Sequence, residues 1–195
     1  MRPALLIAAV LGGVLAAPPE PSAKVFYARE EMFELAFPDA ERVVATDFFL
    51  TADQRALVEE RARTRLDSDL VTVYVGHREG EVIGYAFVDT HVVRTLPETF
   101  LIVLDAAGRV ADTHVLAFYE PLEYLPSERW LAQLDRKRLT DDLRVGGEIV
   151  AITGSTLSSR AVVGGVRRAL ALYEVLLAKC ASSSQGNGRE TSCSK

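Results

Sequence analysis

Small hydroxyl side chains gather between Thr153 and Ser159, where the chain reads TGSTLSS. The cluster separates a short apolar run from a stretch with helical periodicity, so we expect it to lead into a helix that Ser158 caps. Free backbone N–H groups and the positive end of the helix dipole attract an anion there, and a glycine lets the backbone approach it closely. These features favour a phosphate site. The alternative is an ordinary Ser/Thr-rich helix cap, which composition alone favours.

The other chemistry-bearing residue types give little support for nucleophilic or metal chemistry. The three histidines, His77, His91 and His114, lack HxxxH spacing, and the chain has neither a GxSxG pattern nor a GxxxxGK loop. We expect them to be surface or sheet histidines. Cys180 and Cys193 could close a disulfide in an exported protein, but Cys193 falls in a polar tail. The sequence therefore predicts no catalytic residue and no metal site, and a hydrolase that uses the hydroxyl cluster would lack a neighbouring base.

Hydrophobic periodicity predicts an α+β fold, in which helices cover a meandering antiparallel sheet. Runs rich in β-branched and aromatic residues indicate two hairpins, the second closed by an Asx turn at Asp105 to Gly108. Thr51 and Gln54 match a capping box. The expected strands are Leu70–Val75, Val82–Val88, Phe100–Leu104, Val110–Phe118 and Ile149–Ile152, and the expected helices are Ala28–Ala36, Gln54–Leu66, Leu125–Leu134 and Arg160–Ala181. The long last helix follows the hydroxyl cluster and should cover the sheet.

The composition is that of a globular protein. Of 195 residues, 49% are hydrophobic and 25% charged, which excludes a fibrous or wholly disordered chain. The formal net charge is −5, from 22 Lys and Arg against 27 Asp and Glu. Because nucleic-acid binding depends on basic groups, we expect no nucleic-acid partner.

The two ends of the chain differ from its middle. Residues 1–17 combine an early arginine, an apolar run and small residues, as in a cleaved signal peptide; an uncleaved N-terminal anchor is the alternative. Residues 18–27 form a Pro-rich lead, and residues 182–195 are Ser- and Gly-rich, which indicates a disordered tail. One domain over residues 28–181 is expected, in a protein exported to the periplasm or to the outer face of the cytoplasmic membrane.

The TGSTLSS segment, followed by Ala161 and Val162, resembles the [ST]-G-A-T-x-S-S-x-A-V signature of the FMN-binding domain family. This family includes the G subunit of Rnf-type electron transport complexes and the C subunit of sodium-translocating NADH:quinone reductase. The resemblance continues in blocks over most of residues 37–175. These blocks are Phe37–Arg42 before the first strand, Leu50–Arg55, Gly84–Val88, Val103–Val110, Tyr119–Pro121 and Arg129–Leu134.

The resemblance implies an electron-transfer flavoprotein rather than a stand-alone turnover enzyme. Its FMN would be joined through the phosphate to Thr156 by a separate flavin transferase, and its other partners would be membrane or periplasmic electron-transfer proteins. The further cofactor-binding residues would be Thr153, Gly154, Ser155, Leu157 and Ser158 around the phosphate, and Tyr119, Glu120, Pro121 and Leu125 near the ring. Tyr124 and Trp130 are additional aromatic candidates, although the apolar stripe around Trp130 favours core packing.

The chain departs from the family pattern at three places. Val150 stands where the family usually has aspartate, Ser155 stands where it has alanine, and residues 121–125 replace a Gly-rich segment. Serine is a benign replacement for alanine. The valine leaves open a second interpretation, in which the protein is a non-redox extracytoplasmic binding or assembly module that keeps the fold without the flavin.

Overall fold

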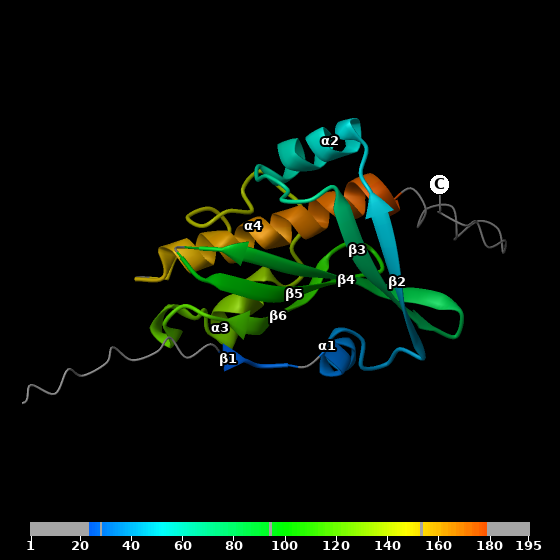
Figure 1. Ribbon diagram of the computed structural model, residues 1–195, viewed down its shortest axis with the longest axis horizontal. Helices are drawn as coiled ribbons and strands as arrows, with labels where there is room; N and C mark the ends of the chain where they lie inside the picture. The colour runs from blue at the N-terminus through cyan, green and yellow to red at the C-terminus, as the bar shows by residue number, and fades with distance from the viewer. Residues whose placement is uncertain (1–23, 28, 94, 153, 179–195) are drawn as a thin grey trace, which may run out of the picture.

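The computed structural model describes residues 24–27, 29–93, 95–152 and 154–178. The expected signal peptide, the tail, Thr153 and both cysteines lie outside these residues. Six antiparallel strands form one sheet in the order β1-β6-β5-β4-β3-β2 (Figure 1). The strands are β1 (Lys24–Val25), β2 (Arg42–Phe49), β3 (Leu70–Arg78), β4 (Glu81–Val92), β5 (Pro97–Asp105) and β6 (Val110–Phe118). The α+β meander predicted from the sequence is confirmed.

Helices cover both faces of the sheet. Figure 1 shows α4 lying across one face with α2 beside it, and α1 on the opposite side. The helices are α1 (Arg29–Ala36), α2 (Ala52–Ala62), α3 (Glu128–Leu131) and α4 (Thr156–Leu172), with 3-10 turns η1 (Leu122–Tyr124) and η2 (Ala132–Leu134) and a π-helical turn η3 (Tyr173–Leu177). Among the described residues, no helix combines the length and the apolar character needed to cross a bilayer.

The central strand β5 explains why two cores form. Its Phe100, Ile102 and Leu104 join the core beneath α2 and α4, whereas Leu101 and Val103 join a smaller core against α1. Because successive side chains of a strand point to opposite faces, a continuous apolar run is the pattern of a strand buried on both sides.

Local signals account for several element boundaries. The Thr51 hydroxyl accepts a bond from the Gln54 N–H while the Gln54 side chain accepts from the Thr51 N–H, so the predicted capping box is present. The Asp105 carboxylate accepts bonds from the backbone of Ala107 and Arg109, as expected for the turn before β6. α2 ends at Ala62 rather than at Leu66, because Arg63 takes a left-handed conformation with φ 54°.

Three further expectations about the elements need correction. Ile149–Ile152 is not a strand: only an isolated bridge joins Ile149 to Val145, and the backbone of Val150 bonds to side chains instead. The expected helix over Leu125–Leu134 is a single α-turn followed by a 3-10 turn. The last helix begins at Thr156 rather than Arg160, so most of the hydroxyl cluster belongs to its first turn.

Two glycines on hairpin turns allow a matched prediction. Gly108 has φ +71°, and a Cβ there would lie 2.0 Å from the buried Tyr173 ring, whereas Gly80 has φ +81° with no atom within 4 Å of a Cβ. Gly108→Ala therefore combines backbone strain with a steric clash and should lower the free energy of unfolding by about 2–4 kcal/mol. Gly80→Ala, with strain alone, should cost about 1 kcal/mol in the same urea titration. Equal losses of unfolding free energy in the two variants would contradict the predicted clash with Tyr173.

Candidate functional site

The N-terminus of α4 carries the residues of the hydroxyl cluster. Gly154 is exposed with φ +88° and has open space where a Cβ would stand. Ser155 occupies the N-cap position, and Thr156 is the first helical residue. The Thr156 side chain is half-buried, and its hydroxyl donates a long 3.5 Å bond to the carbonyl of Ile152. This hydroxyl is therefore only weakly engaged.

The first turn of α4 also presents backbone donors. The helix makes its first backbone bond from the Ser159 N–H to the Ser155 carbonyl, at 3.0 Å. The preceding N–H groups, those of Thr156, Leu157 and Ser158, have no acceptor within the helix, and the Ser155 side chain does not cap them. Three such donors at the positive end of a 17-residue helix form a suitable place for a phosphate.

The segment from Tyr119 to Leu125 lies beside this turn. The Ser155 hydroxyl donates to the carbonyl of Glu123 at 3.5 Å, across 32 positions of the sequence. Ser155 is 4% exposed, so its side of this contact is buried, whereas Glu123 lies at the surface. The structure therefore brings together the two segments that the sequence predicts for the phosphate and for the ring.

Within this second segment, the residues have different surroundings. The Tyr119 N–H donates to the carbonyl of Pro97 at 3.2 Å. Glu120 is 7% exposed, and its Oε1 accepts from the backbone N–H groups of Thr95 and Leu96 at 3.3 Å each. Glu120 therefore holds the turn before β5 in place. Pro121 is exposed, and Leu125 and Tyr124 are half-buried.

Three exposed apolar side chains lie on the segments that meet at the cluster. Leu157 is 46% exposed on α4, Leu122 is 49% exposed on η1, and Val150 is 70% exposed just before the cluster. Trp130 is 7% exposed and belongs to the core, as expected; its Nε1 donates to the carbonyl of Val150 at 2.7 Å. The Gln133 Oε1 accepts from the Val150 N–H at 2.9 Å. These two bonds fix the chain that leads into the cluster.

Ser158 has a different role from the expected helix cap. Because α4 starts at Thr156, Ser158 lies inside the helix and points into the protein, where its hydroxyl donates to Glu98 Oε1 at 3.0 Å. Glu98, on β5, is fully buried. This glutamate was not among the residues predicted from the sequence, although an acid within the apolar strand beginning at Pro97 is an unusual feature that could have indicated it.

Glu98 continues into a line of charged groups that are partly buried. Its Oε2 lies 3.7 Å from His91 Nε2, and His91 Nδ1 lies 2.7 Å from Asp89 Oδ2. Arg168 of α4 holds both oxygens of Asp89 through its Nε and Nη2, at 2.8 and 2.7 Å. Asp89 and His91 are two positions apart on β4, so they share a face of the sheet.

The electrostatics of this line favour its ionised forms. Burial alone would lower the pKa of His91, but the hydrogen bond with Asp89 and the nearby carboxylate of Glu98 outweigh it, and the pKa lies above its ordinary value. Burial alone would raise the pKa of Asp89, but the hydrogen bonds from His91 and Arg168 outweigh it, and the pKa lies below its ordinary value. A positively charged imidazole between two carboxylates is therefore stabilised.

No family model matches the chain. Among curated proteins, the chain is similar to the G subunit of the Na⁺-translocating ferredoxin:NAD⁺ oxidoreductase complex of Acetobacterium woodii, with 30% identity over 125 residues. The similarity covers 55% of this chain and 58% of the relative, so the chain matches a little over half of that protein. This similarity confirms the resemblance to the G subunit of Rnf-type electron transport complexes that the TGSTLSS segment predicts.

Proposed function

We propose that the protein is an exported electron-transfer flavoprotein that holds FMN through a phosphoester to Thr156. The observation that carries this proposal is the position of Thr156: its weakly engaged hydroxyl stands at the first residue of α4, beside three backbone N–H groups that lack helix acceptors. A similar relative that is a subunit of an oxidoreductase complex supports the same function.

The residues present fit a flavin phosphate. Gly154 leaves open space next to Thr156, and the N–H groups of the first turn can donate to phosphate oxygens. When bound, FMN supplies one- and two-electron transfer, which no side chain of this loop can perform. Leu122, Val150 and Leu157 provide exposed apolar surface against which an aromatic ring can lie. The protein's own contribution is thus to anchor the phosphate, position the ring and set its electrostatic surroundings.

The partners follow from the same chemistry. Attachment requires a flavin transferase, and electron transfer requires a donor and an acceptor, which we propose are membrane or periplasmic redox proteins. The relative's name places it in a Na⁺-translocating complex that connects ferredoxin and NAD⁺. We propose a comparable place, at the outer face of the cytoplasmic membrane, for this chain, with residues 1–17 directing export. A covalent bond would prevent loss of the cofactor outside the cytoplasm.

One observation favours a second candidate, a non-redox binding or assembly module. Val150 is 70% exposed at a position where the FMN-binding family usually has aspartate, so a transferase that reads this position would meet an apolar side chain. The two candidates differ in a simple property, because only the first retains a flavin.

The colour of denatured protein tests the proposed function. Protein co-expressed with a flavin transferase should be yellow and should remain yellow in the pellet after denaturation and acid precipitation, because a phosphoester survives unfolding. Visible absorbance of pellet and supernatant is the measurement. Colour released to the supernatant would show reversible FMN binding only, and protein that is colourless from the start would favour the non-redox module.

A further inference from the structure

Glu98 is a buried carboxylate with one oxygen that makes no hydrogen bond to the described residues. Its side chain is fully buried; one oxygen accepts from Ser158, and the other has no hydrogen-bond partner among the described residues. The nearest charged partner of that second oxygen is His91 Nε2, 3.7 Å away, which also lacks a hydrogen-bond partner within the described part of the chain. An unpaired buried carboxylate is costly, so this geometry needs at least one proton on the His91–Glu98 pair.

The other neighbours of His91 restrict where that proton lies. Arg168 keeps Asp89 ionised, so His91 Nδ1 carries the hydrogen that is donated to Asp89. His91 Nε2 therefore faces Glu98 either with a lone pair or with a proton. The Phe100 ring stacks on the imidazole, with centroids 5.6 Å apart and planes at 14°, and so excludes water from one face.

α4 comes close to Asp89, the hydrogen-bond partner of His91. A Cβ at Gly165 would lie 2.6 Å from Asp89 Oδ2, so only glycine leaves room for the carboxylate here. Arg168 is one helical turn further along, and its Nη1 also donates to Thr64 at 3.0 Å. The same helix presents Ser158 to Glu98 at its other end. The helix that carries Thr156 is thus bonded to both ends of the buried line.

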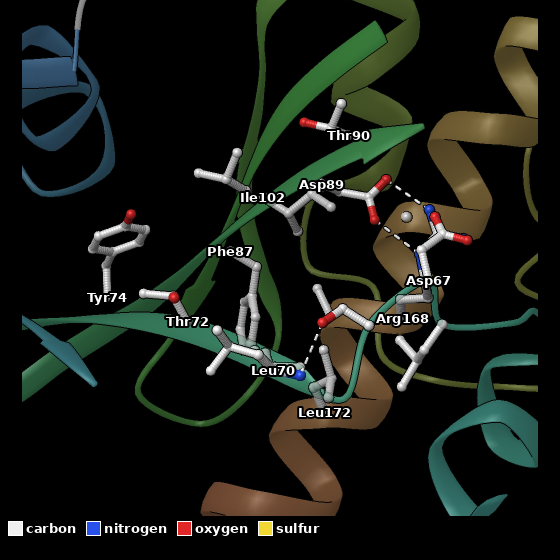
Figure 2. Close-up of a pocket in the computed structure, with 16 residues that line it drawn as sticks. Asp67, Leu70, Thr72, Tyr74, Phe87, Asp89, Thr90, Ile102, Arg168 and Leu172 are labelled. Atoms are coloured by element: carbon white, nitrogen blue, oxygen red, sulfur yellow. Dashed lines mark hydrogen bonds and ion pairs between the residues drawn. The ribbon is translucent and has the colours of Figure 1, made fainter. Parts of the chain in front are cut away.

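A cavity connects the Asp89 end of the line with the surface. It has a volume of about 350 Å³ and lies where β3 and β4 diverge, against α4. Figure 2 shows Asp89 reaching from β4 toward Arg168, with Asp67 nearby. The β3–β4 pairing ends at Tyr74 and Ala86, so the strands separate beyond these residues. Solvent in this opening reaches Asp89, which is hydrogen-bonded to His91.

We propose that the His91–Glu98 pair is a proton site coupled to electron transfer at the flavin on Thr156. This inference rests on the proposed function. When a one-electron donor protein is oxidised and the flavin gains its electron, the pair takes up one proton from water, and a new N–H or O–H bond forms on a pair that already held one proton. When the electron leaves, that proton returns to water. Each electron is thus matched by one proton, and the net charge of the site does not change.

The coupling has a direct electrostatic reason. Added negative charge at a flavin anchored on Thr156 would favour the protonated pair, because Ser158, two residues from Thr156, donates a hydrogen bond to Glu98 and the protein interior screens charge poorly. The charged groups that face His91 are Asp89 from β4, Glu98 from β5 and Arg168 from α4. Because Asp89 and Arg168 hold each other ionised, the proton taken up goes to the remaining pair.

Titration of His91 by NMR in the flavinylated protein tests the proposal without any substitution. The pKa of His91 should be at least about one unit higher in the reduced than in the oxidised protein, a tenfold or larger change in proton affinity. His77, on β3, is the internal control, and its pKa should not differ between the two states. Identical titration of His91 in the two states would overturn the proposal.

Potentiometry of a matched pair of variants gives a second measurement. In Glu98→Gln, the hydrogen bond from Ser158 can persist while the proton-binding oxygen is lost, so the flavin potential should vary less steeply with pH than in the wild type. Protons bound by the reduced flavin itself contribute to both slopes, so the difference between the slopes reports the pair. His114→Gln should keep the wild-type slope. Equal slopes in Glu98→Gln and the wild type would contradict the coupling. The intact mass of the protein distinguishes a failure of this inference from a failure of the proposed function. Protein that lacks the mass increment of FMN would overturn the proposed function itself. Protein that carries FMN but shows no coupling would overturn only this inference.

Discussion

Replacing Arg167 by alanine is expected to lower the free energy of unfolding by about 3–5 kcal/mol, a large share of the stability of a typical domain. Arg167 lies on the inner side of α4 and is 6% exposed. Its guanidinium donates to the carbonyls of Ala62 and Arg61 at the end of α2, at 2.7 and 2.8 Å, and to those of Thr140 and Leu143, at 2.6 and 3.0 Å. Alanine would leave these carbonyls without their donor.

The chemistry of the guanidinium makes even a conservative replacement costly. Burial lowers the pKa of Arg167, yet an arginine remains protonated in proteins, so its charge is compensated here by carbonyl dipoles. Lysine offers a compact ammonium that cannot reproduce a planar fork of donors. Arg167→Lys should therefore recover only part of the loss.

Arg160 provides the control on the same helix. It is exposed, and Arg160→Ala should change the free energy of unfolding by no more than about 0.5 kcal/mol. Urea denaturation of the three variants beside the wild type is the measurement. A loss in Arg167→Ala as small as that in Arg160→Ala would show that the four carbonyl bonds contribute little to the fold.

The parts of the fold that depend on neighbouring residues were predictable. The two hairpins, the Thr51 capping box and the Asp105 turn follow from local patterns, and all are present. β1 was not predicted, because a two-residue strand at Lys24–Val25 carries no periodicity and exists through its pairing with β6. The strand expected at Ile149–Ile152 failed because the side chains of Trp130 and Gln133 bind the Val150 backbone.

The candidate site also has a part that could be predicted from the sequence and a part that could not. The hydroxyl cluster is contiguous, so its place at a helix start could be inferred from the sequence, although the helix begins earlier than expected. Ser158 and Glu98 are 60 positions apart, and Arg168 and Asp89 are 79 apart. Hydrophobic periodicity relates residues within one helix or strand, so contacts between residues this far apart in the sequence cannot be predicted from it. Only the two-residue spacing of Asp89 and His91 on one strand indicates that these groups share a face.

The second large effect is expected at Thr156. Thr156→Val keeps the β-branched shape and removes the hydroxyl, whose contact with Ile152 is a long 3.5 Å bond, so the fold should survive while flavin attachment is abolished. Ser155→Ala is the matched control. It removes the neighbouring hydroxyl, which makes only a 3.5 Å bond to Glu123, and introduces the residue usual in the FMN-binding family. Ser155→Ala should therefore be loaded like the wild type.

Intact-mass measurement after co-expression with a flavin transferase tests the assignment of Thr156 most directly. We expect the mass increment of FMN in the wild type and in Ser155→Ala, and the bare polypeptide mass in a folded Thr156→Val. Circular dichroism of Thr156→Val should match the wild type, so that a missing increment reports the lost hydroxyl rather than a lost fold. Retention of the increment in Thr156→Val would contradict the assignment, because the flavin would then be attached to another residue.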